Sequence, residues 1–255
     1  MNGVFYIGAT GLDAQQTAVD IVANNVTNMN TNAYKRSTVS FSEMLVAPAQ
    51  AGSRQDASAG LAGVNVSASL RDFNPAQLHP TGNAMDVAIR GAGFIPLSHS
   101  GTGHATLWRG GTLHVDTDGY LAAPDGSPLE AMISVPRDVT SLTILPTGEV
   151  QAQVPGQADL LSIGQIDLVS VDDPAKLVAT GNGIYSLDEG STTLSSIRPG
   201  DENDVTIAQG FGEASNVQLS DELVNLMVYQ RAYAANARLV QVGDELMSIA
   251  NGLKR

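Results

Sequence analysis

The sequence predicts an α+β protein in which long N- and C-terminal helices pair as a coiled-coil-like layer and bracket one mainly antiparallel β domain. Both ends of the 255-residue chain space their apolar residues by threes and fours, as helices do. Between them, apolar and polar residues alternate between frequent turn signals, as in short antiparallel strands. The length is sufficient for one large domain or two small ones with a sizeable core.

Charged residues follow the same division of the chain. Residues 1–36 hold two acids and two bases, and residues 210–255 hold five acids and four bases, so almost all of the net charge of −13 falls in the middle. We therefore expect a terminal helical domain (1–36 plus 210–255), a connecting or insertion segment (37–83) and a β-rich outer domain (84–209).

Residues 3–29 predict a helix with two apolar rows. Small residues in the first row, such as Gly11 and Ala14, allow another helix to approach closely. The first row is Val4, Ile7, Gly11, Ala14, Ala18, Ile21 and Asn25, and the second is Phe5, Leu12, Val19, Val22, Val26 and Met29. One apolar row buries a helix against one neighbour, so two rows need two neighbours.

The Asn-rich stretch 24–36 is expected to end this helix, because Asn competes for backbone hydrogen bonds and tolerates left-handed conformations. The stretch is either a polar loop or a fixed turn that leads the chain out of a helical layer, with Lys35 and Arg36 near the helix C-terminus.

Residues 37–83 mix several patterns. Segment 48–63 is mostly Ala, Gly, Ser and Gln, and by itself would be a flexible linker. Residues 64–70 alternate weakly and predict a strand. Further strands are expected at 85–90, 113–115, 120–121, 142–145 and 163–171. Turn signals between these strands, such as Asp118-Gly119 and Asp125-Gly126, favour a barrel-like or sandwich domain.

The last forty residues repeat the design of two apolar rows on one helix. The first row is Leu219, Leu223, Leu226, Tyr233, Ala237, Val240 and Met247, and the second is Val224, Val228, Ala232, Ala235, Leu239, Val242, Leu246, Ile249 and Leu253. Arg231 is either solvated or reaches a neighbouring subunit, and Tyr233 either packs in a core or anchors that contact.

Two such helices can pair and bury one row each, which leaves the second rows exposed over more apolar area than a soluble monomer tolerates. We expect other copies of the chain to cover them, and head-to-tail contacts of this kind build a helical filament or a ring. The residues predicted at the subunit interface are Leu12, Val19, Val22, Asn24, Asn25, Lys35, Arg36, Val224, Arg231, Tyr233, Asn236, Leu239, Val242 and Leu246.

Composition and motifs argue against several other functions. There is no cysteine, and the acidic balance disfavours nucleic acid as a partner. No run is long enough to span a bilayer, and no cleaved signal peptide is expected. His99, His104 and His114 lack metal-site spacing. We expect no metal, no cofactor and no catalysis.

Three parts of the chain contain stretches that resemble the bacterial flagellar rod and hook proteins. Thr10 to Thr17, Ala23 to Val26 and Asn30 to Arg36 are similar to their N-terminal signature. Ser215-Asn216-Val217 and Gln230 to Asn236 are similar to their C-terminal signature. Asp86 to Ile89, followed by Gly93-Phe94, resembles the start of their β domain. The resemblance covers nearly the whole chain and favours the distal rod type.

This resemblance implies a structural subunit of the basal-body distal rod, which crosses the periplasm and transmits torque to the hook. It implies a helical homo-oligomer as well as export through the flagellar type III apparatus without a cleaved signal. The partners that it implies are the proximal rod proteins, the hook protein, and the L-ring and P-ring bushing. Two alternatives remain: a proximal rod or hook-like subunit, and a monomeric β-domain enzyme or binding module.

Overall fold

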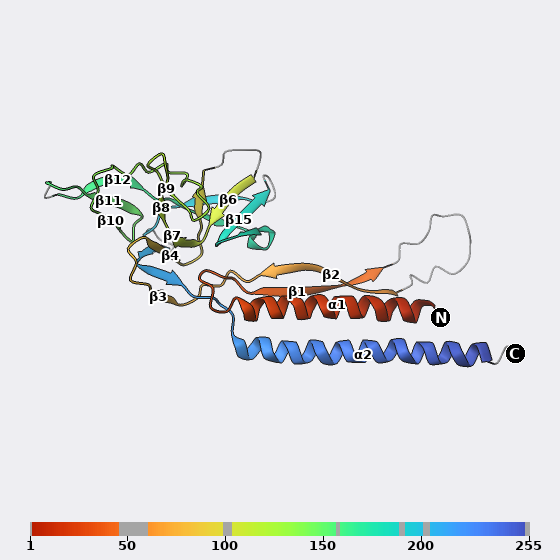
Figure 1. Ribbon diagram of the computed structural model, residues 1–255. Helices are drawn as coiled ribbons and strands as arrows, with labels where there is room; N and C mark the ends of the chain where they lie inside the picture. Colours follow the sequence, from red (N-terminus) through yellow and green to blue (C-terminus); the bar gives the residue numbers. More distant parts are fainter. Residues whose placement is uncertain are drawn as a thin grey trace, which may run out of the picture. The chain divides into compact units, whose positions relative to one another are not determined.

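The computed structural model describes residues 2–45, 61–98, 104–156, 159–188, 192–200 and 205–252. It confirms the α+β class, with helix α1 (Asn2–Thr27) at the start, helix α2 (Leu219–Gly252) at the end, and antiparallel strands between them (Figure 1). The strands of the β-rich part are short, and one 3-10 turn, η1 (Pro174–Lys176), lies among them.

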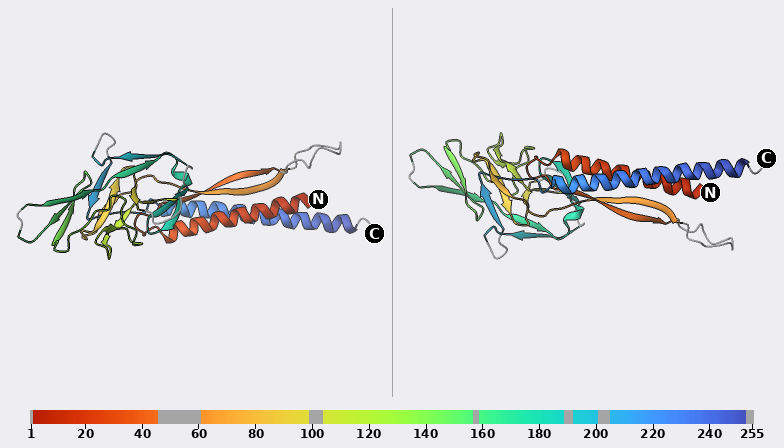
Figure 2. Two further views of the ribbon diagram at one scale, coloured as in Figure 1. Left: turned by 90° about the horizontal axis from the view of Figure 1, so that it is seen from above. Right: turned by 90° about the horizontal axis from the view of Figure 1, so that it is seen from below.

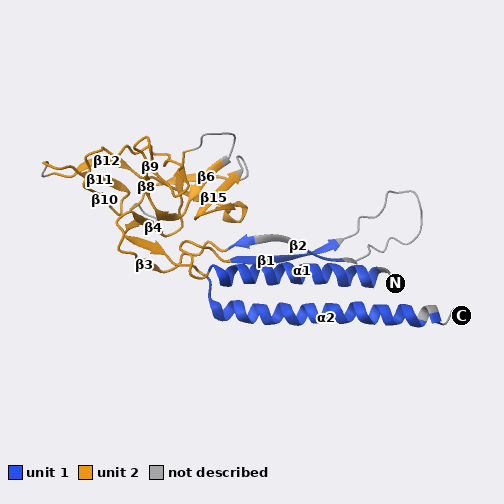
Figure 3. Ribbon diagram, in the orientation of Figure 1, with its two compact units in different colours: residues 1–28, 37–71, 217–255 blue, residues 29–36, 72–216 orange. Residues whose placement is uncertain are grey.

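The chain divides into two compact units (Figure 3). Unit 1 contains Met1–Asn28, Ser37–Arg71 and Val217–Arg255, and unit 2 contains Met29–Arg36 and Asp72–Asn216. Segment 37–83, expected as one connecting piece, therefore contributes residues to both units. Most of the expected insertion 48–63 lies outside the described residues.

Unit 1 is built from the two helices and one β-hairpin. α1 and α2 lie side by side and antiparallel, so the start of α1 and the end of α2 are at the same end of the pair (Figure 2). β1 (Ser37–Leu45) pairs antiparallel with β2 (Leu61–Arg71), and α1 contacts this hairpin as well as α2. The second neighbour of α1 is thus a hairpin of its own chain, whose first strand the sequence pattern did not predict.

The ends of both helices have local causes. At the end of α1, the Asn24 carbonyl accepts from both the N–H of Asn28 at 3.1 Å and its side-chain Nδ2 at 2.9 Å, so the Asn28 side chain shares an acceptor with the helical backbone. Asp221 and Glu222 occupy the first turn of α2, where carboxylates are stabilised by the partial positive charge of a helix N-terminus. The N–H groups of both residues donate to the Gln218 carbonyl at 3.1 Å.

Unit 2 consists of small antiparallel sheets. A four-stranded sheet has the order β14 (Val178–Gly181), β15 (Ile184–Asp188), β6 (His104–Trp108), β5 (Ile95–Leu97). Two three-stranded sheets have the orders β17 (Thr206–Gln209), β4 (Asp86–Arg90), β7 (Gly110–Thr112) and β10 (Ser141–Ile144), β11 (Glu149–Gln153), β12 (Leu161–Gln165). The two-stranded pairs are β13 (Leu168–Val171) with β16 (Leu194–Ile197), β18 (Phe211–Glu213) with β3 (Leu78–Pro80), and β8 (His114–Val115) with β9 (Leu121–Ala122).

One apolar core joins most of these sheets. Trp108, Ile89 and Leu168 are fully buried in it, although they belong to three different sheets. A second cluster gathers Phe94, Tyr185 and the half-buried Phe73, whose rings meet edge to face. Alternating short strands therefore build a common interior, as the sequence pattern indicated.

One expected strand is wrong. Residues 163–171 were predicted as a single strand, but the structure breaks them at Ile166-Asp167 into the end of β12 and the whole of β13, which belong to different sheets. Ile166 itself is buried, and its N–H donates to the Gly148 carbonyl. Apolar alternation continues through this corner, so periodicity alone could not reveal it.

Candidate assembly surface

The contact between α1 and α2 depends on glycine. A methyl group on Gly8 would lie 2.6 Å from Val240 Cγ2, and one on Gly11 would lie 2.6 Å from Asn236 Nδ2. Further along, a methyl group on Gly243 would lie 3.5 Å from the Phe5 ring. Small residues let the two helix backbones approach closely, as the row containing Gly11 predicted. The α2 face that contains Asn236, Val240 and Gly243 is therefore the one that meets α1.

A buried polar group fixes the other end of the helix pair. Asn25 Nδ2 donates to the Ser37 carbonyl at 2.8 Å and to Glu222 Oε2 at 3.2 Å, and Asn25 Oδ1 accepts from the Ser37 N–H at 2.9 Å. Asn25 and Glu222 are almost completely buried. One amide thus ties together α1, α2 and the start of β1, which sets the axial register of unit 1.

The second apolar row of α2 is left uncovered. Its large side chains are half exposed or more, namely Val224 (55%), Val228 (55%), Leu239 (52%), Val242 (50%), Leu246 (55%) and Ile249 (60%). They lie on a different face of α2 from Asn236, Val240 and Gly243, which are at the contact with α1. A continuous apolar row of this length, open to solvent, is typical of a surface that another protein covers.

The residues predicted at the interface fall into three groups. Val224, Leu239, Val242, Leu246, Arg231 and Tyr233 are exposed on α2, and Asn24 is exposed on α1. Leu12, Val19, Arg36 and Asn236 are partly covered. Val22, Asn25 and Lys35 are buried inside their own units, so their contacts are with the same chain.

Sequence reasoning missed an ion cluster inside unit 2. Glu213 Oε1 accepts from Lys35 Nζ at 2.6 Å and from the Ala76 N–H at 3.0 Å, while Glu213 Oε2 accepts from Arg109 Nε at 3.1 Å. Arg109 also donates to the carbonyls of Gly91 and Gly93. The three charged side chains are almost completely buried. Their positions, 35, 109 and 213, are too far apart in sequence for any spacing rule to connect them.

The charges in this cluster perturb each other. Burial lowers the pKa of Lys35 below its ordinary value, although the Glu213 carboxylate opposes this shift. Burial raises the pKa of Glu213, but the positive charges of Arg109 and Lys35 outweigh it, so the net pKa of Glu213 lies below its ordinary value. Glu213 is therefore held as a carboxylate between two buried cations.

The turn after α1 is a fixed structure in unit 2. Ala33 has a φ of 57°, and its N–H donates to the Glu213 carbonyl at 2.8 Å. The Arg36 N–H donates to Asn216 Oδ1 at 2.7 Å, and Asn216 Nδ2 donates to the Asp72 carbonyl at 2.7 Å. The positive φ at Ala33 carries the cost expected for a residue with a Cβ.

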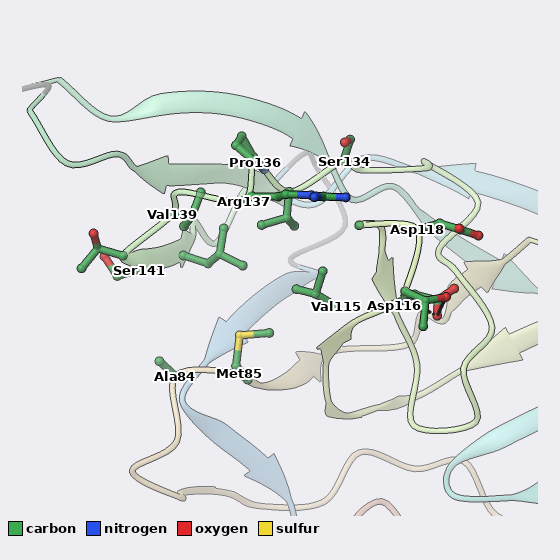
Figure 4. A pocket seen from close by; sticks show the side chains of 15 residues that line it. Ala84, Met85, Val115, Asp116, Asp118, Ser134, Pro136, Arg137, Val139 and Ser141 are labelled. Atoms are coloured by element: carbon green, nitrogen blue, oxygen red, sulfur yellow. Dashed lines mark hydrogen bonds between the residues drawn. The ribbon is translucent and has the colours of Figure 1, made fainter.

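A pocket of about 850 Å³ lies in unit 2, lined partly by Val115, Asp116, Asp118 and Arg137 (Figure 4). Asp116 Oδ1 accepts from the backbone N–H of Thr117, as a turn residue does. No group of three or more residues able to hold a metal ion occurs among the described residues. His99 lies outside the described residues. Neither described helix is long and apolar enough to cross a membrane.

Several known proteins are similar to this chain along almost its whole length. The flagellar basal-body rod protein FlgG of Agrobacterium fabrum is 32% identical, over 96% of this chain and 97% of that protein. FlgG of Borreliella burgdorferi is 30% identical over the full length of both chains. The flagellar basal-body rod protein FlgF of Caulobacter vibrioides is 28% identical, over 96% of this chain and 95% of that protein.

Three family models match successive parts of the chain. Residues 5–35 match the flagella basal body rod protein model, residues 88–152 the flagellar hook protein FlgE/F/G D1 domain, and residues 208–253 the flagellar basal body rod FlgEFG protein C-terminal model. With the paired terminal helices, these matches define the class as an axial protein of the flagellar rod and hook. Within that class, the chain belongs to the FlgG family of flagellar basal-body rod proteins. It is a structural subunit of the rod, and the resemblance seen in the sequence is confirmed.

Proposed function

We propose that this protein polymerises into the helical tube of the distal rod, and that the exposed apolar row of α2 is a surface through which its copies join. The single observation that carries this proposal is the exposure of Val224, Leu239, Val242 and Leu246 on a helix that already packs another of its faces against α1. Fully burying an exposed side chain of this kind contributes roughly 1.5–3 kcal/mol, and because these are about half exposed, each can still contribute about half of that on assembly.

A second copy is the occupant that best fits this row. A rod subunit is surrounded by identical neighbours, and a surface that repeats on every copy can be covered without any other protein. Arg231 is exposed beside the row, and Tyr233 is exposed on another side of the same helix. Both residue types are favoured at interfaces, because they bury large areas and still satisfy a polar end.

Membership of the rod family supports further proposals about partners and location. The assembled tube would meet proximal rod proteins at one end and the hook protein at the other, inside the bushing formed by the L-ring and P-ring. The subunit would reach this place through the flagellar type III export apparatus, without a cleaved signal peptide. Catalysis forms no part of the proposal, because a structural rod family supports a mechanical role.

The alternative of a hook-like or proximal rod subunit is disfavoured by the comparisons that support FlgG. The alternative of a monomeric enzyme or binding module finds support only in the 850 Å³ pocket near Asp116 and Asp118. That pocket lacks any buried titratable side chain, which a catalytic site ordinarily uses.

Leu239→Asp tests the proposal by placing a charge on the exposed row. We expect the variant to be stably folded, because Leu239 is 52% exposed and contributes little to the interior, but to form no rods. Gln241→Asp is the matched control, since Gln241 is exposed on a different side of the same helix turn. Basal bodies purified from complemented cells should contain the Gln241→Asp variant and lack the Leu239→Asp variant. Normal rods built from Leu239→Asp would overturn the proposal.

A further inference from the structure

The two helices of unit 1 carry opposite charges with the same spacing. Asp13 and Asp20 are the only charged residues of α1, and Arg231 and Arg238 are the only basic residues of α2. All four side chains are exposed, and no ion pair among the described residues includes any of them. Each pair is seven residues apart, which is two helical turns or about 10 Å along the axis.

These pairs lie on surfaces that the chain itself does not cover. The side of α1 that packs against α2 contains Gly11, Ala14 and Ala18, which are buried, and the two aspartates point to the opposite side. The two arginines flank the exposed apolar row of α2. Neither pair can reach the other within one chain, because each faces away from the contact between the helices.

We propose that α2 of one copy packs on the outer side of α1 of the next copy, with Arg238 paired to Asp13 and Arg231 paired to Asp20. This inference rests on the proposed function, and it names the partner surface and the register of the same assembly. Copies that point the same way along a tube bring α2 antiparallel to the neighbour's α1. In that orientation both ion pairs form at once, since the spacing of the acids equals the spacing of the bases.

Other residues at the same levels agree with this register. It places Val242 opposite Ala9, Ala235 opposite Gln16, and Val228 opposite Ala23 of the neighbouring copy. Ala9, Gln16 and Ala23 are exposed, and the two alanines are small enough for the large apolar side chains of α2 to approach. The apolar row of α2 thus gains a surface that can cover it, while the charges at its edge are neutralised.

Registers one heptad away are poorer. Sliding α2 by seven residues in one direction leaves a single ion pair, Arg231 with Asp13, and places Asp20 opposite Val224. Sliding it by seven residues in the other direction pairs Arg238 with Asp20 but brings Glu245 level with Asp13. Like charges held opposite each other destabilise a helix pair, so the charge pattern selects one register.

This register implies a definite axial offset between neighbouring copies. Within one chain, Gly11 lies against Asn236 and Asn25 against Glu222, so Asp13 is level with about residue 234. Pairing Asp13 with Arg238 of the neighbour shifts that copy by three or four residues. At 1.5 Å per residue the offset is about 5 Å.

Paired cysteines test the register directly, because the chain has no cysteine of its own. In the Gln16→Cys/Ala235→Cys variant, the two thiols meet between copies and cannot meet within one. Oxidation of purified basal bodies should therefore produce a ladder of crosslinked multimers on a non-reducing gel. Gln16→Cys/Val242→Cys is the matched control, one heptad out of register, and should produce no ladder. A ladder from the control, or from neither variant, would overturn the register.

Charge reversal provides a second test on the whole protein. Asp13→Arg/Asp20→Arg and Arg231→Asp/Arg238→Asp should each abolish rod assembly alone. Combining all four substitutions in one chain should restore assembly, because both partners of each ion pair are then reversed. Expressing the two double variants together should also restore assembly, because each variant then supplies the charge that the other needs. Failure of both restorations would refute the ion pairs. The proposed function would still stand if Leu239→Asp blocks assembly, so the two failures are distinguishable.

Discussion

Glu213→Gln is expected to destabilise unit 2 severely. The substitution keeps the shape of the side chain but removes the carboxylate that pairs with both Lys35 and Arg109, which are almost completely buried. Removing one partner of a buried ion pair typically costs about 3–5 kcal/mol, because an uncompensated charge is left in the interior. If the free energy of unfolding falls by about 2 kcal/mol for each molar of urea, the urea concentration at the unfolding midpoint should decrease by roughly 2 M.

Lys35→Met should cost less, about 1–3 kcal/mol. In this variant Glu213 keeps its hydrogen bonds from Arg109 and the Ala76 N–H, so no charge is left unpaired. Burial opposes the charge of Lys35 and lowers its pKa. The expected order of destabilisation is therefore Glu213→Gln, then Lys35→Met, with Lys176→Gln near zero. Lys176 is the control, since its pairing with Asp173 is half exposed and such pairs contribute little.

Urea unfolding followed by tryptophan fluorescence is the appropriate assay. The chain has one tryptophan, Trp108, and it is fully buried in the core of unit 2, so its emission reports that unit alone. Far-ultraviolet ellipticity, which is dominated by α1 and α2, follows unit 1 separately. If Glu213→Gln left the Trp108 transition where it is in the native protein, the electrostatic reasoning would be refuted.

Three further predictions follow from individual contacts. Acid should destabilise unit 2 below about pH 4.5, because the pKa of Glu213 is lowered and the folded state binds this proton less readily than the unfolded chain. The stability that the ionised Glu213 contributes is present above its ordinary pKa of 4.5 and is lost as pH falls through the pKa of the folded state. The free energy of unfolding of the Glu213→Gln variant should therefore depend less on pH in this range. Gly11→Ala should lower the melting temperature of the helix pair, because its new methyl group meets Asn236. Gly3→Ala, with open space around it, should instead stabilise α1 by roughly 0.5–1 kcal/mol. Thermal melting followed by ellipticity at 222 nm distinguishes the two variants, and equal effects would refute the close packing of the helices. In the same assay, Asn25→Ala should lower the free energy of unfolding by about 1–3 kcal/mol, because it leaves the buried polar groups of Glu222 and Ser37 with fewer hydrogen-bond partners. Asn24→Ala, at the exposed neighbouring position, should change it by no more than roughly 0.5 kcal/mol. A small effect at Asn25 would contradict its role in setting the register of the helix pair.

The helices could be predicted well because their information is local. The row from Gly11 to Asn25 repeats the spacing of a helix, and the Asn-rich stretch that follows competes with the helical backbone, so the end of α1 could be read from residue types. Each of these features depends on residues within a few positions of one another.

The β1–β2 hairpin and the corner at Ile166 could not be predicted in the same way. β1 pairs with β2 across a segment of little apolar pattern, and both strands contact α1, which comes much earlier in the chain than β2. At Ile166 the apolar alternation continues while the chain passes from one sheet to another. Sheet membership is decided by partners distant in sequence, which periodicity does not encode.

The sequence by itself determined that this protein has two double-rowed helices at its ends, an acidic β-rich middle, and the signatures of a flagellar rod subunit. Repeating spacing and local turn chemistry are sufficient for these conclusions, since each arises within a few helical turns or strands. Only the tertiary structure decided which α2 row meets α1, because that depends on where Gly8 and Gly11 allow close approach. It also revealed the ion cluster of Lys35, Arg109 and Glu213, since charges so far apart in the chain meet only after folding.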